Sequence, residues 1–409
     1  FNELEEMFAF LLYTVLLFNN FSFHEFRRPK VLIIGFDGFR WDYPRYFNTP
    51  TLNAIAAKGI HARNGMRASF TTKTLPNFWT LATGLHIESH GIIDMKFFDE
   101  KFNETFSFIG KSNRNSKWWV GEPIWVTAKR QGKKVGVYFW AGSDVKLNGI
   151  LPDFWRRYRS NAKFETRMNT AIDWLDKEDV DLAMVYVNEP DKTAHTYGTF
   201  HHKVRQVVEA LDSLLRSVVN QLEARNLANV VNLLIVSDHG MTDLKSIRTN
   251  KSIINLNEFI SVENDLIKMR VGIPAGLFPK PGKLNYVYAK LKNASAHMKV
   301  YLKEELPSQL RYQKSSRIAP IVVIPDEGYF IERQKRRSIK GLYIGQHGYD
   351  NDLSSMRPIF YAAGFQFKKN LAVDIFNNVD VYPLTCHLLG IKPAPNNGSL
   401  ASLKNFLSN

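Results

Sequence analysis

The sequence predicts an α/β domain in which helices flank a mostly parallel sheet. Three short apolar runs, at 31–36, 182–187 and 233–237, each lead into acidic residues. Such runs, rich in β-branched residues, are typical of strands that are buried on both faces of a parallel sheet. Strand-like runs alternate with helix-like runs along the chain, which indicates repeated strand–helix–strand units.

The helix-like runs follow recognisable start and stop signals. Residues 50–57 open with proline and stop at Gly59, and further helices are expected at 122–131 and 164–175. Residues 203–222 carry a regular apolar stripe, which core packing explains fully. Pro76 is expected as the first residue of another helix, which would put Thr74 at that helix's N-terminus.

One domain, at 29–405, accounts for most of the chain. Residues 245–340 are less regular and are expected to form an inserted β-rich or mixed subdomain. Within it, the basic run 333–337 is expected to be a solvated or protease-sensitive loop.

The composition fits a large globular enzyme. The 409 residues are 44% hydrophobic and carry a formal net charge of +15, which raises the local concentration of anionic substrates or surfaces. No aromatic–basic repeat or nucleic-acid-binding motif accompanies the charge, so no nucleic-acid specificity is predicted. The single cysteine, Cys386, sits in an apolar helix-like run and is expected to be a buried structural thiol.

The first 24 residues are expected to be a targeting segment. Residues 7–18 are apolar, which is the length of a signal-peptide core and short for a bilayer span. A signal anchor that attaches the protein to a membrane, or a buried N-terminal helix, remains an alternative. Asn-x-Ser/Thr sequons agree with a secreted or extracellular glycoprotein, and they lie at Asn20, Asn103, Asn250, Asn293 and Asn397.

Polar residues follow the predicted strands. In an open α/β sheet, ligands bind at the carboxyl ends of the strands, so these residues should meet at one edge. A mixed set of carboxylates and imidazoles favours zinc, because magnesium and calcium prefer oxygen ligands alone. The residues concerned are Asp37, Asp191, His195, Asp238 and His239.

Thr74 is the candidate nucleophile. At a helix N-terminus the backbone N–H groups and the helix dipole favour an anion such as phosphate. A threonine hydroxyl is a weak nucleophile at neutral pH, but a nearby metal ion can activate it. A simple helix cap is the alternative function for this residue.

Taken together, the motifs resemble the ecto-nucleotide pyrophosphatase/phosphodiesterase family, within the alkaline phosphatase superfamily. The resemblance runs from about residue 30 to residue 403 and implies an alkaline-phosphatase-like fold. The matching stretches are 37–40, 72–77, 83–85, 88–92, 189–191, 237–241, 347–350 and 393–398.

This resemblance implies a site with two zinc ions. One ion would be held by Asp37, Asp238, His239 and the hydroxyl of Thr74. The other would be held by Asp191, His195 and His347. Thr74 would attack the phosphorus of a phosphodiester or pyrophosphate and form a threonyl-nucleotide intermediate, with the two ions stabilising the attacking and leaving oxygens.

The resemblance also implies a substrate site. Trp140 and Tyr158 resemble the aromatic pair that sandwiches the base in nucleotide-cleaving members, and Lys73 is placed to attract phosphate. Ordinary aromatic packing is the alternative for these two rings. Because the family also cleaves lysophospholipids and choline phosphoesters, those substrates are a second hypothesis.

The chain departs from the family pattern at Met95, which stands where the family has an asparagine that hydrogen-bonds the substrate phosphate. A thioether sulfur cannot donate a hydrogen bond. A third hypothesis is therefore a nucleotide-binding protein that is derived from the enzyme and turns over slowly. Gln346 and Asn188 replace the acidic residues that are usual at their positions.

Overall fold

The computed structural model describes residues 28–246, 251–334 and 343–408. The predicted targeting segment, the sequons at Asn20 and Asn250, and most of the basic run 333–337 lie outside these ranges. Within them, no helix combines the length and the apolar character needed to cross a bilayer.

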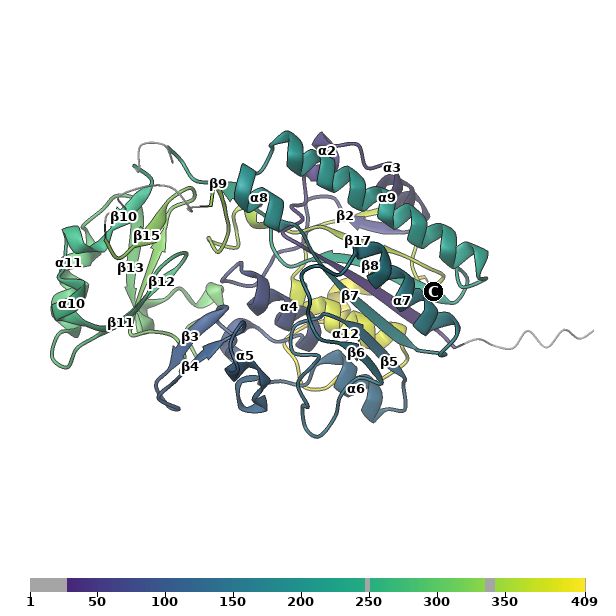
Figure 1. The fold of residues 1–409 in the computed structure, drawn as a ribbon, viewed down its shortest axis with the longest axis horizontal. Coiled ribbons are helices and arrows are strands. Elements are labelled where there is room, and N and C mark those ends of the chain that lie inside the picture. Colours follow the sequence, from purple (N-terminus) through teal and green to yellow (C-terminus); the bar gives the residue numbers. More distant parts are fainter. Residues whose placement is uncertain (1–27, 247–250, 335–342, 409) are drawn as a thin grey trace, which may run out of the picture.

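A large sheet dominates the part of the molecule that contains both ends of the described chain (Figure 1). Every pairing within the run β8–β1–β7–β5–β6 is parallel, and β17 runs antiparallel to both β8 and β2. The predicted mostly parallel α/β fold is confirmed. Across the described sheet the strands are β18 (Leu371–Val373), β2 (Ile60–Ala62), β17 (Phe360–Ala363), β8 (Val231–Ser237), β1 (Lys30–Asp37), β7 (Leu182–Pro190), β5 (Val135–Tyr138) and β6 (Phe154–Arg156).

Strand β1 divides its side chains between two cores. Val31 and Ile33 belong to the core on one face of the sheet, whereas Leu32, Ile34 and Phe36 belong to the core on the other. This alternation follows from the two-residue period of a strand. Because both faces are buried, the strand is apolar from Val31 to Phe36, between the charged residues Lys30 and Asp37 at its ends.

Helices cover both faces. Residues of α4 (Thr74–Thr83), α6 (Ile124–Arg130) and α12 (Val381–Leu388) pack in the first core. Residues of α3 (Pro50–Lys58), α7 (Phe164–Asp176) and α9 (His202–Ala224) pack in the second. The helices predicted at 50–57, 122–131, 164–175 and 203–222 are therefore confirmed, with shifts of up to two residues at their ends. Short helices α2 (Tyr43–Tyr46), α5 (Ile87–His90) and α8 (Asp191–Tyr197) complete this part.

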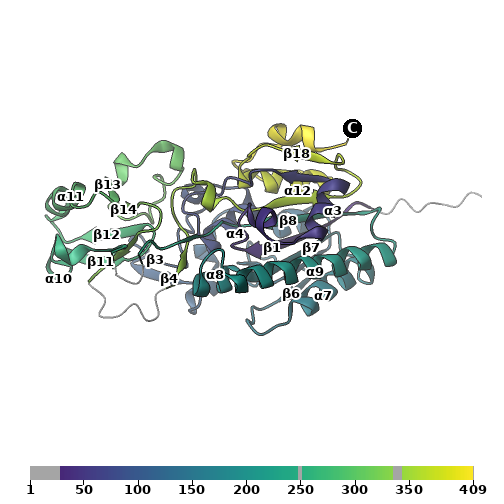
Figure 2. The same cartoon turned by 90° about the horizontal axis from the view of Figure 1, so that it is seen from above.

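A second, smaller sheet lies at the other end of the molecule, beside the hairpin of β3 (Lys96–Asp99) and β4 (Glu104–Ser107) (Figure 1, Figure 2). It has its own apolar core and falls within the range 245–340 predicted to be inserted. Its strands, in order, are β11 (Leu266–Arg270), β12 (Ala275–Pro279), β14 (Ile321–Pro325) and β13 (Met298–Leu302), and β10 (Ile253–Asn255), β15 (Phe330–Glu332), α10 (Val262–Asp265) and α11 (Leu284–Lys292) accompany it.

The single cysteine and the sequons can be placed in this fold. Cys386 is buried in α12, and its burial raises the pKa of the thiol to about 12, as expected of a structural residue. Asn103 and Asn293 are exposed. Asn397 is exposed as well, but its side-chain oxygen accepts a hydrogen bond from the His86 N–H at 2.9 Å.

A buried carboxylate joins two helices on the second face. Asp212 of α9 accepts hydrogen bonds from the backbone N–H groups of Thr51 and Leu52, at 3.0 and 2.9 Å. These are first-turn groups of α3, whose own cap residue, Thr49, makes no side-chain capping bond. Asp212 therefore caps α3 from another helix and adds a favourable charge at its N-terminus.

Replacing this carboxylate should destabilise the fold. Asp212→Ala leaves two buried N–H groups without an acceptor, which we expect to cost about 2 kcal/mol or more. Thermal unfolding should show a lower midpoint for Asp212→Ala and a smaller loss for Asp212→Asn, which keeps one acceptor. The exposed neighbour Ser213→Ala is the control and should unfold like the wild type. Equal midpoints for all three variants would contradict the capping role.

Candidate functional site

Three neighbouring strands end in acidic residues at one edge of the central sheet. Asp37 is the last residue of β1, Asp238 follows β8, and Asp191 opens α8 directly after β7. The β1–β7 register shifts between Phe36 and Asp37, so Asp37 pairs with Pro190 and comes next to Asp191. The three acidic side chains therefore converge at the strand ends, as expected from the sequence.

The three carboxylates repel one another. Burial, together with the charges of Asp238 and Asp191, raises the pKa of Asp37 well above its ordinary value. Burial likewise raises the pKa of Asp191, against the opposing effect of His195 and His239. Two or three buried negative charges at this separation need cations nearby to remain ionised.

Three histidines surround these carboxylates, and their orientation is fixed by the backbone. His195 Nδ1 lies 2.7 Å from the Gly345 carbonyl, and His239 Nδ1 lies 2.8 Å from the Gly240 carbonyl. His347 Nδ1 lies 2.9 Å from the carbonyl of Thr72. Since a carbonyl can only accept, each Nδ1 is the donor, and each neutral ring presents an unprotonated Nε2. Outer hydrogen bonds of this kind are a recurrent feature of metal-binding histidines.

The Nε2 atoms gather around the carboxylates. His347 Nε2 lies 3.2 Å from His195 Nε2, and His195 Nε2 lies 3.3 Å from Asp191 Oδ1. His239 Nε2 lies 3.1 Å from Asp238 Oδ2. The unprotonated Nε2 atoms of His347 and His195 face each other, and their lone pairs repel unless a cation lies between them.

Two buried oxygens at this edge have no hydrogen-bond partner among the residues that the structure describes. They are Asp191 Oδ1 and Asp238 Oδ2. Because unpaired buried polar atoms are costly, these oxygens favour a bound cation. Within the described ranges, two groups have a geometry that could hold a metal ion. One consists of Asp37, Asp238 and His239, and the other of Asp191, His239 and His347. Nitrogen and oxygen donors in this mixture fit zinc.

Thr74 stands beside the first of these groups. Its Oγ1 lies 3.1 Å from His239 Nε2 and 3.3 Å from Asp37 Oδ1. The prediction that Pro76 is the first helical residue is wrong by two positions, because α4 begins at Thr74 with Lys73 as its extended cap residue. Thr74 nevertheless lies at the helix N-terminus, as expected.

Hydrogen bonds from side chains of the 72–77 motif hold the loop before Thr74. The sequence alone does not show these contacts. Asn77 is buried, and its Nδ2 donates to the carbonyls of Ser69, Thr71 and Lys73. Thr72 Oγ1 donates to the Tyr349 carbonyl, and its own carbonyl accepts from His347. The loop that carries Thr74 and the loop that carries His347 are therefore coupled.

An apolar cavity of about 470 Å³ opens next to Thr74. Tyr158 is 41% exposed, whereas Trp140 is 2% exposed and donates its indole N–H to the Phe78 carbonyl at 3.0 Å. Both rings line the cavity, as do Phe78, Phe139 and Tyr186, which the sequence motifs did not indicate. Among the described residues, the Tyr158 ring contacts those of Phe139 and Tyr186, with ring centroids 5.3 and 6.0 Å apart.

Tyr186 also belongs to the carboxylate cluster. Its hydroxyl donates to Asp37 Oδ2 at 2.5 Å. In the sequence this tyrosine is one residue in an apolar strand, and only the β1–β7 pairing brings it to Asp37.

Lys73, which is predicted to attract phosphate, is paired with a carboxylate. Its ammonium lies 2.5 Å from Asp94 Oδ2, and Arg270 of the smaller sheet pairs with the same oxygen. Met95 follows Asp94 and lines the apolar cavity and the cavity that contains Asp37 and His347. Arg270 had no sequence signal, because it lies in the inserted range far from every motif.

Comparisons with known proteins show the family to which the chain belongs. The family model for type I phosphodiesterase / nucleotide pyrophosphatase matches residues 31–350. The chain belongs to this family. Its catalytic region is therefore that of a phosphodiester hydrolase, and the resemblance drawn from the motifs is confirmed.

Several relatives are similar over nearly the whole chain. Human ectonucleotide pyrophosphatase/phosphodiesterase family member 5 is 36% identical over 402 residues, which cover 98% of this chain and 82% of the relative. The bis(5'-adenosyl)-triphosphatase of Xenopus laevis is 37% identical, over 93% of this chain and 82% of the relative. The chain spans only 44% of the length of family member 3 from Bos taurus, at 37% identity.

Solved structures agree with this membership. Murine family member 5, in an inactive threonine-to-alanine variant bound to AMP, superposes with a TM-score of 0.87 at 37% identity. The match covers 93% of this chain and all of that one. The agreement supports the predicted alkaline-phosphatase-like fold.

Gly38 is expected to be essential to the geometry of this phosphodiesterase site. Its φ is +63°, and a Cβ there would lie 2.8 Å from Asp191 Cβ. Gly38→Ala should displace Asp191 and lower both bound metal and activity, while the backbone strain itself costs only about 1 kcal/mol. The matched control is Gly132→Ala, where φ is +76° and no atom of a described residue lies within 4 Å of the added Cβ.

Elemental analysis and a phosphodiesterase assay on both alanine variants check this. The control should keep its metal content and activity with a similar loss of stability. If both variants lose activity equally, strain rather than the approach to Asp191 is responsible.

Proposed function

We propose that this protein is an extracellular, zinc-dependent nucleotide pyrophosphatase/phosphodiesterase in which Thr74 is the nucleophile. The observation that carries the proposal is the position of Thr74 Oγ1, 3.1 Å from His239 Nε2 and 3.3 Å from Asp37, at the N-terminus of α4. A hydroxyl in that position can be activated and can reach a phosphate that the helix N-terminus attracts.

Two ions would share the donor atoms described above. Asp37, Asp238 and His239, with Thr74, would hold one, and Asp191, His195 and His347 would hold the other. Two bound zinc ions supply positive charge for the attacking and leaving oxygens of an in-line displacement. The unpaired carboxylate oxygens and the Nε2 atoms that face one another support this assignment.

The proposed reaction at Thr74 has two steps. Thr74 Oγ loses its proton to water and forms a bond to the phosphorus of the nucleotidyl group, and the leaving group departs with the electron pair of the broken P–O bond. Water then attacks the threonyl ester, which releases the nucleoside monophosphate and restores the hydroxyl of Thr74. Backbone N–H groups in the first turn of α4 lie where they can stabilise the phosphate oxygens.

Nucleotides are the favoured substrates. The cavity of about 470 Å³ beside Thr74 is lined by aromatic rings, on which a base can stack. A murine relative is described with AMP bound, and a Xenopus laevis relative is named a bis(5'-adenosyl)-triphosphatase. The same apolar lining would also accept an acyl chain, which keeps lysophospholipids as a second candidate.

The location is also proposed by analogy. Relatives are named ectonucleotide pyrophosphatases or venom phosphodiesterases. A secreted protein, or one on the outer face of the cell, would carry glycans at the exposed residues Asn103 and Asn293.

Metal removal tests the cofactor. Purified protein should contain two zinc ions per chain by elemental analysis, and a zinc chelator should abolish activity. It should also lower the unfolding temperature, because binding to the native state stabilises it. Active protein with fewer than one transition-metal ion per chain would overturn the zinc assignment.

Thr74→Ala should abolish turnover without unfolding the protein. The hydroxyl supplies the attacking atom, whereas loss of a helix-terminal side chain costs about 1 kcal/mol. Thr74→Ser, which keeps a hydroxyl, is the matched variant and should retain measurable turnover. An alanine variant that keeps more than about a tenth of the wild-type rate rules out covalent catalysis by Thr74.

Met95→Asn should raise turnover of nucleotide esters. An amide at this position adds a donor near the phosphate, and one such donor is worth about 10²–10³ in rate in an adapted site. In this unadapted pocket we expect about tenfold, since errors of around 1 Å waste most of the benefit. The value of kcat/KM on a nucleotide ester and on a choline phosphoester is the measurement. No gain on either substrate refutes the missing-donor account, and wild-type preference for the choline ester favours the lipid candidate.

A further inference from the structure

A buried arginine lies behind the cavity of about 470 Å³ beside Thr74, which we call the aromatic cavity. Arg167 of α7 is 0% exposed and does not line the cavity itself. Its guanidinium lies 4.9 Å from the ring centroid of Phe139 and 4.9 Å from that of Phe164. Because Phe139 lines the cavity, the arginine contacts the cavity wall from the protein side.

No carboxylate of a described residue pairs with this guanidinium. Its terminal nitrogens donate to the backbone carbonyls of Tyr186 and Ala162, both at 2.9 Å, and Asn188 Oδ1 lies 3.5 Å from each nitrogen. Burial lowers the pKa of the guanidinium, and the neighbours that oppose this effect are tyrosines. A buried cation without a counter-ion costs free energy, so an apolar side chain would be the cheaper choice for packing alone.

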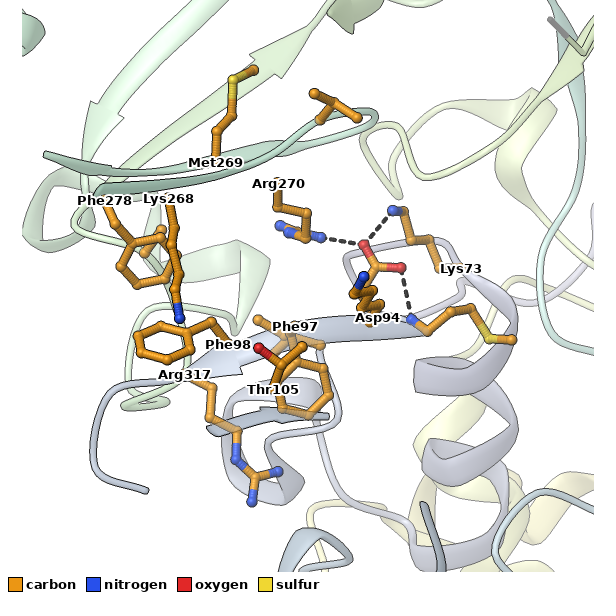
Figure 3. A pocket seen from close by; sticks show the side chains of 15 residues that line it. Lys73, Asp94, Phe97, Phe98, Thr105, Lys268, Met269, Arg270, Phe278 and Arg317 are labelled. Atoms are coloured by element: carbon orange, nitrogen blue, oxygen red, sulfur yellow. Dashed lines mark hydrogen bonds and ion pairs between the residues drawn. The ribbon is translucent and has the colours of Figure 1, made fainter. Parts of the chain in front are cut away.

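Other cations near the site have carboxylate partners. Lys73 and Arg270 both pair with Asp94, as Figure 3 shows. Arg317, the other arginine that the described residues bury, pairs with Asp99 at 2.9 Å. The arginine behind the aromatic cavity instead has rings and carbonyls as its partners.

Phe139 has a backbone conformation that residues with side chains rarely adopt. Its φ is +72°, in the left-handed region, which is unfavourable for an aromatic residue. Such strain persists only where the surrounding structure holds the residue, and it is common at ligand-binding sites. The guanidinium of Arg167 against the Phe139 ring is one contact that holds it.

The position of the Tyr158 ring depends on the two residues that Arg167 contacts. Tyr158 lines the aromatic cavity, is 41% exposed, and packs against the rings of Phe139 and Tyr186. Arg167 contacts the first of these residues through its ring and the second through its carbonyl. One buried side chain therefore supports both neighbours of a ring on which a base can stack.

We propose that Arg167 is a positioning residue for the nucleoside half of the substrate. It holds Phe139 and Tyr186 in place, and through them it holds the Tyr158 ring in the orientation in which a base can stack. The proposal rests on the proposed function, because it concerns the base that a nucleotide brings into the aromatic cavity. A wall that is ordered before the substrate arrives loses little conformational entropy on binding, which accounts for a buried charge and a strained residue at this place.

The test compares two substrates that share a leaving group and differ in the transferred half. The 4-nitrophenyl ester of AMP carries a base, and methyl 4-nitrophenyl phosphate does not. Arg167→Met removes the charge and the donors but keeps much of the length of the side chain. It should raise KM for the AMP ester by about fivefold or more, the scale of one weakened base–aromatic stack, with kcat within about twofold. On the methyl ester, kcat/KM should stay within about twofold.

Arg167→Lys is the second variant. It keeps a charge but lacks the planar fork that contacts two rings and two carbonyls at once. It should show the same difference between the two substrates, with a smaller rise in KM. If Arg167→Met does not fold, this lysine variant decides the question by the same criteria.

The control is Arg225→Met. Arg225 also contacts α7, but it pairs with Asp173 at 2.6 Å and does not line the aromatic cavity. This variant should change the values on neither substrate. Equal losses on both esters with the Arg167 variants, or no rise in KM for the AMP ester, overturn the positioning role while the proposed function stands. Wild-type protein that does not hydrolyse the AMP ester overturns both.

Discussion

The repulsion among three carboxylates at the ends of β8, β1 and β7 is the constraint on which the site depends. Asp37, Asp191 and Asp238 are brought together by parallel pairing that also builds the hydrophobic core. The sheet therefore provides the free energy that holds like charges at close range. Such an arrangement is stable at neutral pH only if positive charge joins it.

The backbone determines which side-chain atoms point toward that positive charge. Each of the three imidazoles is oriented by a carbonyl, so the Nε2 atoms point inward whatever the state of the carboxylates. Thr72 contributes one of those carbonyls and precedes the nucleophile by two residues. The position of Thr74 and the orientation of His347 thus depend on the same loop, which Asn77 secures from within α4.

The residues that the sequence predicted are those with a local signal. An apolar run that ends in Asp37 or Asp238 predicts a strand with an acidic residue at its end. The reason is that a buried parallel strand must be apolar and must end at the sheet's edge. The position of Thr74 at a helix N-terminus can be predicted because a proline two residues later indicates a helix start. The helix begins earlier than that signal implies. The division of the β1 side chains between two cores follows from the two-residue period of a strand.

The residues that the sequence did not predict act across long chain separations. Tyr186 reaches Asp37 from the neighbouring strand β7, and Asp212 caps α3 from α9. Arg270 meets Asp94 from 176 residues away, in a region without motifs. No local pattern encodes such pairs, because tertiary packing alone decides which side chain fills the gap beside a buried charge. Lys73 illustrates the consequence, since the sequence predicts its contact with phosphate but not its ion pair with Asp94.

Anomalous diffraction at the zinc absorption edge tests the central claim most directly. The account predicts two peaks about 3.5–4 Å apart. One should lie about 2.0–2.2 Å from donor atoms of Asp37, Asp238 and His239, and the other at that distance from Asp191, His195 and His347. A single peak shared by His239 and His347, or none in catalytically active crystals, would contradict it.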